Sequence, residues 1–405
     1  MSDSDRLLSD AERDLFAKFF AGLEATGIVA VLLRNYEDFP RTIGHDLDVF
    51  IRRRDLPQAD RLIRKLIAAA GGTVLIVHER DYFLDIRFVV DTSAAEAIHL
   101  DLYHGAFTWH GLPYLSEEEL LASRGKYAGW LVPHPAHEAL NIFFASVLWG
   151  GFFKARYQAR IAELLAPPEN RAEFNRCVQR AFGESGAPPF DLGLPGEPDK
   201  KLVRDYAVRL RRALRRQSFR HQPLAAAVRL GRYWRVEFGT FLHPKGLTIA
   251  VMGPEPSQNA VVLEGLQERI GELFGQTHRR IFGETTANGS LMKLFRQWLA
   301  CWTSWPLRMR KPKAQVQLIL SNGAAGDWWC QPARHGFGKL PGWLLKLAAR
   351  CVPQPDFTFV LTTDSADRRY ADWVKGGRRR RAVEAGSSQK AMLDCRRKAR
   401  RNRTA

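Results

Sequence analysis

The sequence has few cysteines, and they are not paired. Five are scattered over 405 residues without any C-x-x-C spacing: Cys177, Cys301, Cys330, Cys351 and Cys395. Disulfide frameworks and compact zinc motifs need closely spaced ligands, so this pattern predicts reduced thiols in a cytoplasmic protein and no zinc site. Four histidines also match no compact zinc spacing, and we expect surface or hydrogen-bonding roles for them: His45, His99, His104 and His110.

Long apolar runs are missing as well. No run reaches the roughly 18–20 residues that a membrane-spanning helix needs. The first 14 residues are acidic and polar, which predicts no secretory signal peptide. We therefore expect a cytoplasmic protein, with peripheral contact at the inner membrane as an open alternative.

Acidic residues are outnumbered by basic ones. The chain has 61 Lys and Arg against 43 Asp and Glu, which gives a formal net charge of +18. Much of the excess lies in residues 200–235 and 378–403, whereas residues 1–150 are nearly balanced. Such a charge attracts phosphate-rich partners, so nucleotides, nucleic acid and anionic membrane all stay open.

The pattern of apolar residues predicts an α/β protein with two domains. Residues 1–166 alternate short strands with amphipathic helices, which indicates a mixed sheet with C-terminal helices. Residues 167–244 are Pro/Gly-rich and then basic and helical, and are predicted to be a linker. Residues 245–375 carry buried-type strands at 247–252, 316–320 and 357–361, typical of a parallel sheet. Residues 376–405 are predicted to be a basic, disordered tail.

Three carboxylates are the main candidates for chemistry. On a strand over 47–51, Asp46 and Asp48 share one face while Leu47 and Val49 share the other. A second strand over 98–103 places Asp101 opposite its apolar residues. Neighbouring carboxylates repel each other, and Mg²⁺, which prefers oxygen ligands, removes that repulsion. The pattern predicts a metal site, although charged residues on edge strands also occur simply to prevent aggregation.

The segment LLRNYEDFP…IGHDLDVFI resembles the nucleotidyltransferase superfamily related to DNA polymerase β. More narrowly, it looks like nucleotidyltransferase-like proteins encoded near bacterial surface-polysaccharide genes, over about residues 10–150. The resemblance implies that Asp46 and Asp48 are paired metal ligands and that Asp101 is the third carboxylate. It also implies Mg²⁺ as cofactor, a nucleoside triphosphate as substrate and an acceptor that the sequence does not identify.

One position departs from the pattern of that superfamily. Most active members carry a Gly-Gly or Gly-Ser pair whose backbone N–H groups hold the triphosphate, and this chain has Arg34-Asn35 there. The guanidinium of Arg34 suits a phosphate, and it equally suits a structural ion pair with a carboxylate. Arg34 and Asn35 are therefore the candidates for nucleotide binding.

A second resemblance lies in residues 245–375, which look like a degraded thymidylate kinase-like P-loop domain. Gly253-Pro254 follows an apolar strand, as in that family, but the place of the catalytic Lys holds Asn259. The Ser/Thr positions that follow hold Ala260 and Val261. Ser321-Asn322 stands where that family has an Asp-Arg pair. Two later segments still resemble the family: Arg334-His335-Gly336-Phe337-Gly338 and Gln354-Pro355-Asp356. A P-loop without its Lys and its Ser or Thr loses the contacts to the β- and γ-phosphates and to Mg²⁺, so we expect no kinase activity.

These patterns leave three functions open. The first is a Mg²⁺-dependent nucleotidyltransferase in surface-polysaccharide or glycoconjugate synthesis, with a catalytically inactive second domain. The second is a non-catalytic accessory or scaffold protein that contacts membrane-associated polysaccharide machinery. The third is a basic nucleic-acid-binding protein, although no nucleic-acid-binding motif accompanies the basic segments.

Overall fold

The computed structural model describes residues 6–90, 97–153, 155–190, 192, 198–253, 256–274, 276–281, 291–333, 335, 337–352, 354–362 and 380–384. The chain divides into two units, Met1–Phe238 and Gly239–Ala405. Among the helices of the described residues, none combines the length and the apolar composition needed to cross a membrane.

The first unit is built on a five-stranded mixed sheet in the order β2-β4-β7-β6-β5. Only β4 and β7 are parallel neighbours, and the other pairs are antiparallel. The strands of this sheet are β2 (Val31–Leu32), β4 (Leu47–Ile51), β5 (Thr73–Glu79), β6 (Phe83–Val89) and β7 (Ile98–His104). Short pairs surround it: β1 (Arg6–Leu7) with β3 (Thr42–Ile43), β8 (Phe107–Trp109) with β9 (Leu112–Leu115), and β10 (Gly125–Tyr127) with β11 (Trp130–Val132).

Two helices cover one face of this sheet. α1 (Asp10–Ala25) begins at a capping box formed by Ser9 and Glu12, and α2 (Leu56–Ala69) has Pro57 in its first turn. Both helices pack their apolar faces into one core with the alternate strand residues Leu47, Val49, Ile51, Ile98, Leu100 and Leu102. Strand alternation consequently turns Asp48 and Asp101 toward the opposite face.

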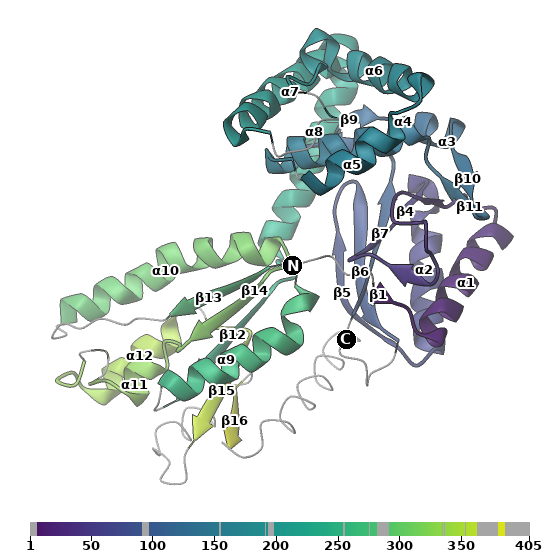
Figure 1. The fold of residues 1–405 in the computed structure, drawn as a ribbon. Helices are drawn as coiled ribbons and strands as arrows, with labels where there is room; N and C mark the ends of the chain where they lie inside the picture. Colours follow the sequence, from purple (N-terminus) through teal and green to yellow (C-terminus); the bar gives the residue numbers. More distant parts are fainter. Residues whose placement is uncertain are drawn as a thin grey trace. The chain divides into compact units, whose positions relative to one another are not determined.

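The other helices of the first unit gather around a second core, apart from α1 and α2 (Figure 1). They are α3 (Glu117–Ala122), α4 (Pro135–Ala145), α5 (Ala155–Leu164), α6 (Pro168–Phe182), α7 (Lys200–His221) and the first part of α8 (Pro223–Leu242). Side chains of α4, α6 and α7, such as Phe143, Phe174 and Leu210, are fully buried together. The structure thus places most of the predicted linker inside the first unit, because these helices have an apolar face that the basic composition obscures.

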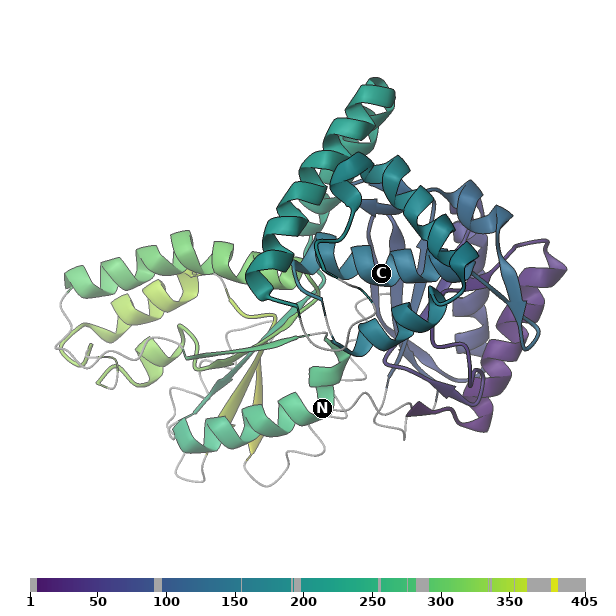
Figure 2. The ribbon, with the colours of Figure 1, turned by 45° about the horizontal axis from the view of Figure 1, so that its top comes forward.

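The second unit contains a five-stranded sheet in the order β13-β14-β12-β15-β16, in which every neighbouring pair is parallel. Its strands are β12 (Leu247–Met252), β13 (Thr277–Ile281), β14 (Leu318–Asn322), β15 (Phe357–Thr362) and β16 (Arg380–Glu384). Its helices are α9 (Pro256–Ile270), α10 (Leu291–Ala314), α11 (Asp327–Cys330) and α12 (Gly342–Cys351). Figures 1 and 2 show α9 on one face of the sheet and α10 with α12 on the other.

The parallel sheet confirms the sequence prediction for this unit and is compatible with a kinase-like domain. β14 begins two residues later than predicted, because buried Val316 has a φ of 57° and interrupts the extended backbone. β16 lies within the segment predicted to be disordered, and it pairs with β15. The rest of the predicted tail lies outside the described residues.

Candidate functional site

Asp48 and Asp101 are direct neighbours on parallel strands. They occupy paired positions of β4 and β7, and Asp46 immediately precedes β4. Each carboxylate offers an oxygen that lies within 4.8 Å of the oxygens offered by the other two. Asp48 is buried, whereas Asp46 and Asp101 are partly exposed. The structure therefore brings together the three residues singled out in the sequence, while their roles in metal binding and catalysis stay predictions.

Arg34, which follows β2, makes ion pairs with two of these carboxylates. Its Nη2 donates to Asp46 Oδ2 at 3.0 Å, and its Nε donates to Asp48 Oδ2. The other oxygen of Asp48, Oδ1, is buried and has no hydrogen-bond partner among the described residues. Because a buried acceptor without a partner is costly, this oxygen marks a position where a cation would be stabilised.

The three carboxylates lie close together, and burial and mutual repulsion change the pKa values of Asp48 and Asp101. Burial is the main cause that raises the pKa of Asp101 well above its usual value, and Asp85, Asp48 and Asp46 raise it further. Burial also raises the pKa of Asp48 to about 6, although Arg34 opposes this effect. Burial lowers the pKa of Arg34, but Asp48 and Asp46 outweigh it and hold that pKa well above the usual value. A single guanidinium thus balances only part of the negative charge that the cluster carries when ionised.

A fourth carboxylate, Asp85 on β6, lies opposite Asp101 in the sheet and was not singled out from the sequence. It is buried and accepts hydrogen bonds from Nε and Nη2 of Arg87. The signal was present in the segment FLDIRFV, where Asp85 and Arg87 alternate with the core residues Leu84 and Ile86. Asp85 is therefore paired with Arg87, and its negative charge still raises the pKa of Asp101.

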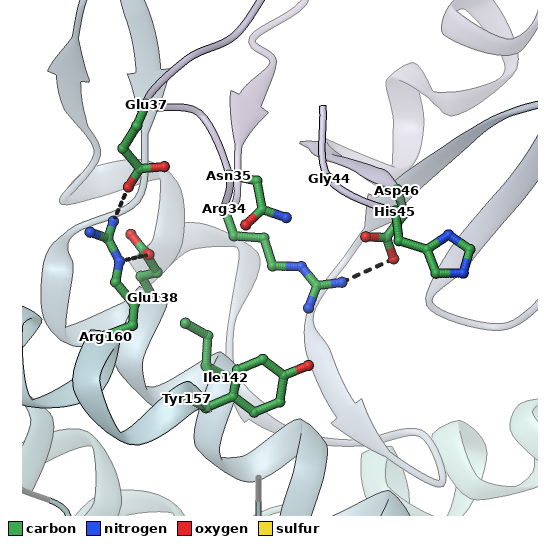
Figure 3. Close-up of a pocket in the computed structure, with 10 residues that line it drawn as sticks. All are labelled: Arg34, Asn35, Glu37, Gly44, His45, Asp46, Glu138, Ile142, Tyr157 and Arg160. Carbon is green, nitrogen blue, oxygen red and sulfur yellow. Dashed lines mark hydrogen bonds and ion pairs between the residues drawn. The ribbon is translucent and has the colours of Figure 1, made fainter. Parts of the chain in front are cut away.

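A cavity of about 390 Å³ lies beside Asp46 (Figure 3). Its lining residues come from the segment before β4 and from α4 and α5: Arg34, Asn35, Glu37, Gly44, His45, Asp46, Glu138, Ile142, Tyr157 and Arg160. Asp46, a member of the carboxylate cluster, and its ion-pair partner Arg34 therefore also line the cavity. The volume falls within the range of small-molecule sites in proteins.

The backbone of the segment between β2 and β4 fixes one side of the cavity. Asn35 adopts a left-handed conformation with a φ of 55°, which Asn tolerates better than most residues. A Cβ atom on Gly44 would lie 2.7 Å from Nδ2 of Asn35, so a larger residue at position 44 would displace the side-chain amide of Asn35. Asn35 thus shapes the wall of the cavity next to Arg34.

The opposite side of the cavity holds a hydrogen-bonded network that the sequence analysis missed. Tyr36 Oη donates to Glu138 Oε2 at 2.6 Å, and Arg160 Nε donates to Glu138 Oε1 at 2.8 Å. Arg160 Nη2 also forms an ion pair with Glu37 Oε1 at 2.6 Å. No sequence spacing indicates this network, because Tyr36, Glu138 and Arg160 are more than 20 residues apart from one another.

In the second unit, the position that the sequence resemblance assigns to a P-loop Lys holds a buried amide. Asn259 is fully buried, and its Nδ2 donates to Oδ1 of Asn322 at 3.2 Å, at the end of β14. Asp356 accepts hydrogen bonds from the backbone N–H of Thr248 at 2.8 Å and from Nζ of Lys313 at 2.7 Å. Pro254, Arg334 and Gly336 of the kinase-like motifs lie outside the described residues.

Comparisons with known proteins leave the family of the chain open. No family model matches the chain, and no curated protein matches it. Among solved structures, a thymidylate kinase from Ehrlichia chaffeensis is similar, with 15% sequence identity and a TM-score of 0.31, over 38% of this chain and 99% of that chain. Structural likeness at this score is too small for any role to pass from one protein to the other.

Proposed function

We propose that the first unit is a Mg²⁺-dependent nucleotidyltransferase that acts in bacterial surface-polysaccharide or glycoconjugate synthesis. The observation that carries the proposal is the convergence of Asp46, Asp48 and Asp101, whose carboxylate oxygens lie within 4.8 Å of one another next to a cavity. The polysaccharide context is supported only by the sequence resemblance described above.

The donor set fits magnesium. Three carboxylates supply hard oxygen ligands, and the buried Oδ1 of Asp48 lacks any other partner in the described part of the chain. Asp46 and Asp48 would hold the ion, which neutralises the charge that develops on the phosphates during transfer. Asp101 would be a third ligand or, in its ionised form, would accept the proton of the attacking hydroxyl.

In the proposed reaction an acceptor hydroxyl attacks the α-phosphorus of a nucleoside triphosphate. A new oxygen–phosphorus bond forms, the bond between the α-phosphorus and the bridging oxygen breaks, and pyrophosphate leaves with that electron pair. If Asp101 is the general base, its carboxylate takes the proton of the attacking hydroxyl. Arg34 lies at the cavity wall, where its guanidinium would turn from the carboxylates to the phosphates once the metal ion neutralises Asp46 and Asp48.

The same arginine supports a second candidate function. Because Arg34 already bridges Asp46 and Asp48, its guanidinium can serve as a permanent replacement for a metal ion. The first unit would then be a non-catalytic accessory protein of the polysaccharide machinery. The two candidates predict different effects of removing the guanidinium of Arg34. In an enzyme its removal weakens nucleotide binding, whereas in an accessory protein its removal allows a metal ion to bind.

Calorimetric titration of Mg²⁺ and each nucleoside triphosphate separates these candidates. For an enzyme, we expect the wild-type chain to bind the magnesium–nucleotide complex, Asp48→Asn to lose at least about tenfold in affinity, and Arg34→Gln to lose about 10–100-fold in nucleotide affinity. Asp14→Asn, at an exposed position of α1, is the control and should bind as the wild type does. If the wild type binds nothing and Arg34→Gln gains Mg²⁺ binding, the enzyme proposal is wrong and the accessory function holds.

We also propose that the second unit does not transfer phosphoryl groups. The uncharged amide of Asn259 stands in the Lys position, and it is fully buried and hydrogen-bonded to Asn322 rather than open to a phosphate. Incubation of the chain with labelled ATP and nucleoside monophosphates should leave all label in ATP.

A further inference from the structure

A second cluster of metal-ligating side chains lies between α4 and α6, away from the three carboxylates in the sequence. His137 comes from α4, while Glu173 and Cys177 lie one turn apart on α6. Their ligand atoms all lie within 4.8 Å of one another. His137 and Cys177 are each 2% exposed, whereas Glu173 is partly exposed and connects the cluster to the surface.

The distances within this cluster match the edges of a tetrahedron around zinc. His137 Nε2 lies 3.4 Å from Glu173 Oε1 and 3.7 Å from Cys177 Sγ, and Sγ lies 3.3 Å from the same glutamate oxygen. Zinc binds N and O ligands at about 2.0–2.2 Å and S at about 2.3 Å, so tetrahedral ligands lie about 3.4–3.6 Å apart. The three side chains therefore need to move only slightly for one zinc ion to lie at bonding distance from all three atoms.

A hydrogen bond behind the histidine fixes which ring nitrogen faces the cluster. Ser123 Oγ donates its only proton to the backbone carbonyl of Glu119 at 2.8 Å. It therefore accepts from Nδ1–H of a neutral His137, at 3.1 Å, and this leaves Nε2 with a free lone pair. Metal-binding histidines usually donate their other N–H in this way, which orients the ring.

Without a cation, the cluster places two hydrogen-bond acceptors, His137 Nε2 and Glu173 Oε1, next to each other. The lone pair of Nε2 and the carboxylate of Glu173 face each other at 3.4 Å, and the thiol of Cys177 has one weak proton to share between them. The second oxygen of Glu173 pairs with Arg176, whose side chain is 76% exposed and free to swing into solvent. A divalent cation bound to Nε2, Sγ and Oε1 would satisfy all three atoms.

We propose that His137, Glu173 and Cys177 form a zinc-binding site with a fourth position open to water. Thiolate and imidazole ligands select zinc over magnesium, which distinguishes this site from the all-carboxylate cluster. Binding forms a bond between zinc and sulfur and releases the thiol proton to solvent. Since Glu138, the next residue on α4, lines the cavity, the bound ion would also fix the helix that forms one cavity wall.

The test uses the full-length protein, stripped of metal with a chelator and then titrated with Zn²⁺ and Co²⁺. We expect one equivalent of tightly bound Zn²⁺, and a Co²⁺ complex with a thiolate-to-cobalt charge-transfer band. That band requires a sulfur ligand, so ions bound at Asp46, Asp48 and Asp101 cannot produce it. Cys177→Ser should abolish the band and lower the Zn²⁺ affinity at least about 100-fold, whereas Cys351→Ser, at an exposed cysteine, should change neither.

A second substitution keeps the test decisive if Cys177→Ser does not fold. Glu173→Gln alters a partly exposed side chain, retains its shape and leaves the thiolate band present but shifted, with about 10–100-fold weaker Zn²⁺ binding. The proposal is overturned if the wild-type chain retains no Zn²⁺ against a weak chelator. It is equally overturned if its Co²⁺ complex lacks the thiolate band, because Cys177 is then an ordinary buried thiol.

Discussion

At the scale of single residues, His104 shows how burial controls a charge. It is 3% exposed at the end of β7, and neither ring nitrogen has a hydrogen-bond partner among the described residues. Burial lowers its pKa to about 4, with further lowering by Arg53 and Arg232 against the opposing effect of Asp81. The unfolded chain, with a pKa of about 6.5, thus binds a proton more readily than the folded one does.

This difference predicts a pH dependence of stability. The contribution of His104 is fully present above pH 6.5 and is lost as the pH falls toward 4, at a cost on the order of 2–3 kcal/mol. His104→Leu should flatten the loss of unfolding free energy between pH 6.5 and 4, as measured by urea denaturation at several pH values. His221→Gln, at an exposed position, is the control. Equal slopes for the wild type and His104→Leu would contradict the prediction.

Residue patterns in the sequence were informative wherever strand alternation decided the direction of a side chain. Asp48 and Asp101 turn away from Leu47 and Leu100 as the period of two predicts. The sequence did not decide whether Arg34 binds a phosphate or pairs with a carboxylate. That role depends on the distance from Arg34 to Asp46 and Asp48, which lie beyond an irregular turn. The same holds for His137 and Cys177, which are 40 residues apart and meet only because α4 packs on α6.

At the scale of elements, a buried carboxylate connects the turn between β5 and β6 to α8. Asp81 Oδ1 accepts from Arg232 Nε at 2.7 Å and from Arg53 Nη2 at 3.0 Å, and its side chain is 3% exposed. The two arginines are each more than a third exposed, so solvent screens part of this interaction. The ion pair between Arg232 and Asp81 still contributes to the packing of α8 on the sheet of the first unit.

We therefore expect Asp81→Ala to lower the free energy of unfolding of the first unit by about 1–3 kcal/mol. Hydrogen exchange of amides in α8 should accelerate more than exchange in β7, because the substitution removes a contact of that helix. Asp60→Ala removes a comparable ion pair with Arg64 within α2 and should cost less than about 0.5 kcal/mol. A uniform acceleration over the whole first unit would show that Asp81 does not act through α8.

The elements predicted most closely were those with strong periodicity and clear ends. The strands over 47–51 and 247–252 agree with β4 and β12 residue for residue. α6 and α7 were expected in a linker because Pro, Gly and Arg dominate their composition, yet Phe174 and Leu210 bury them in the first unit. Composition reports the exposed face of such helices, whereas the narrow apolar stripe decides where they pack.

At the scale of the whole molecule, each unit has a hydrophobic core of its own among the described residues. α2 contributes Ile63 to a core that contains residues of the first unit only, and α12 contributes Leu345 to a core of the second. Both side chains are almost completely buried, at 0% and 1% exposure. Cooperative unfolding follows contiguous packing, so the units should lose their structure in separate steps.

This separation predicts local effects for two matched substitutions. Ile63→Ala and Leu345→Ala each leave a cavity in a buried core and should each cost about 2–5 kcal/mol. In hydrogen exchange at low denaturant, Ile63→Ala should weaken the protection of β4 and β7 while β12 and β14 keep theirs, and Leu345→Ala should do the reverse. Each variant is the control of the other, because the burial and the number of atoms removed are alike. If either variant lowers protection equally in both sheets, the chain unfolds as one cooperative body and a ligand bound at the three carboxylates would stabilise the parallel sheet of the second unit as well.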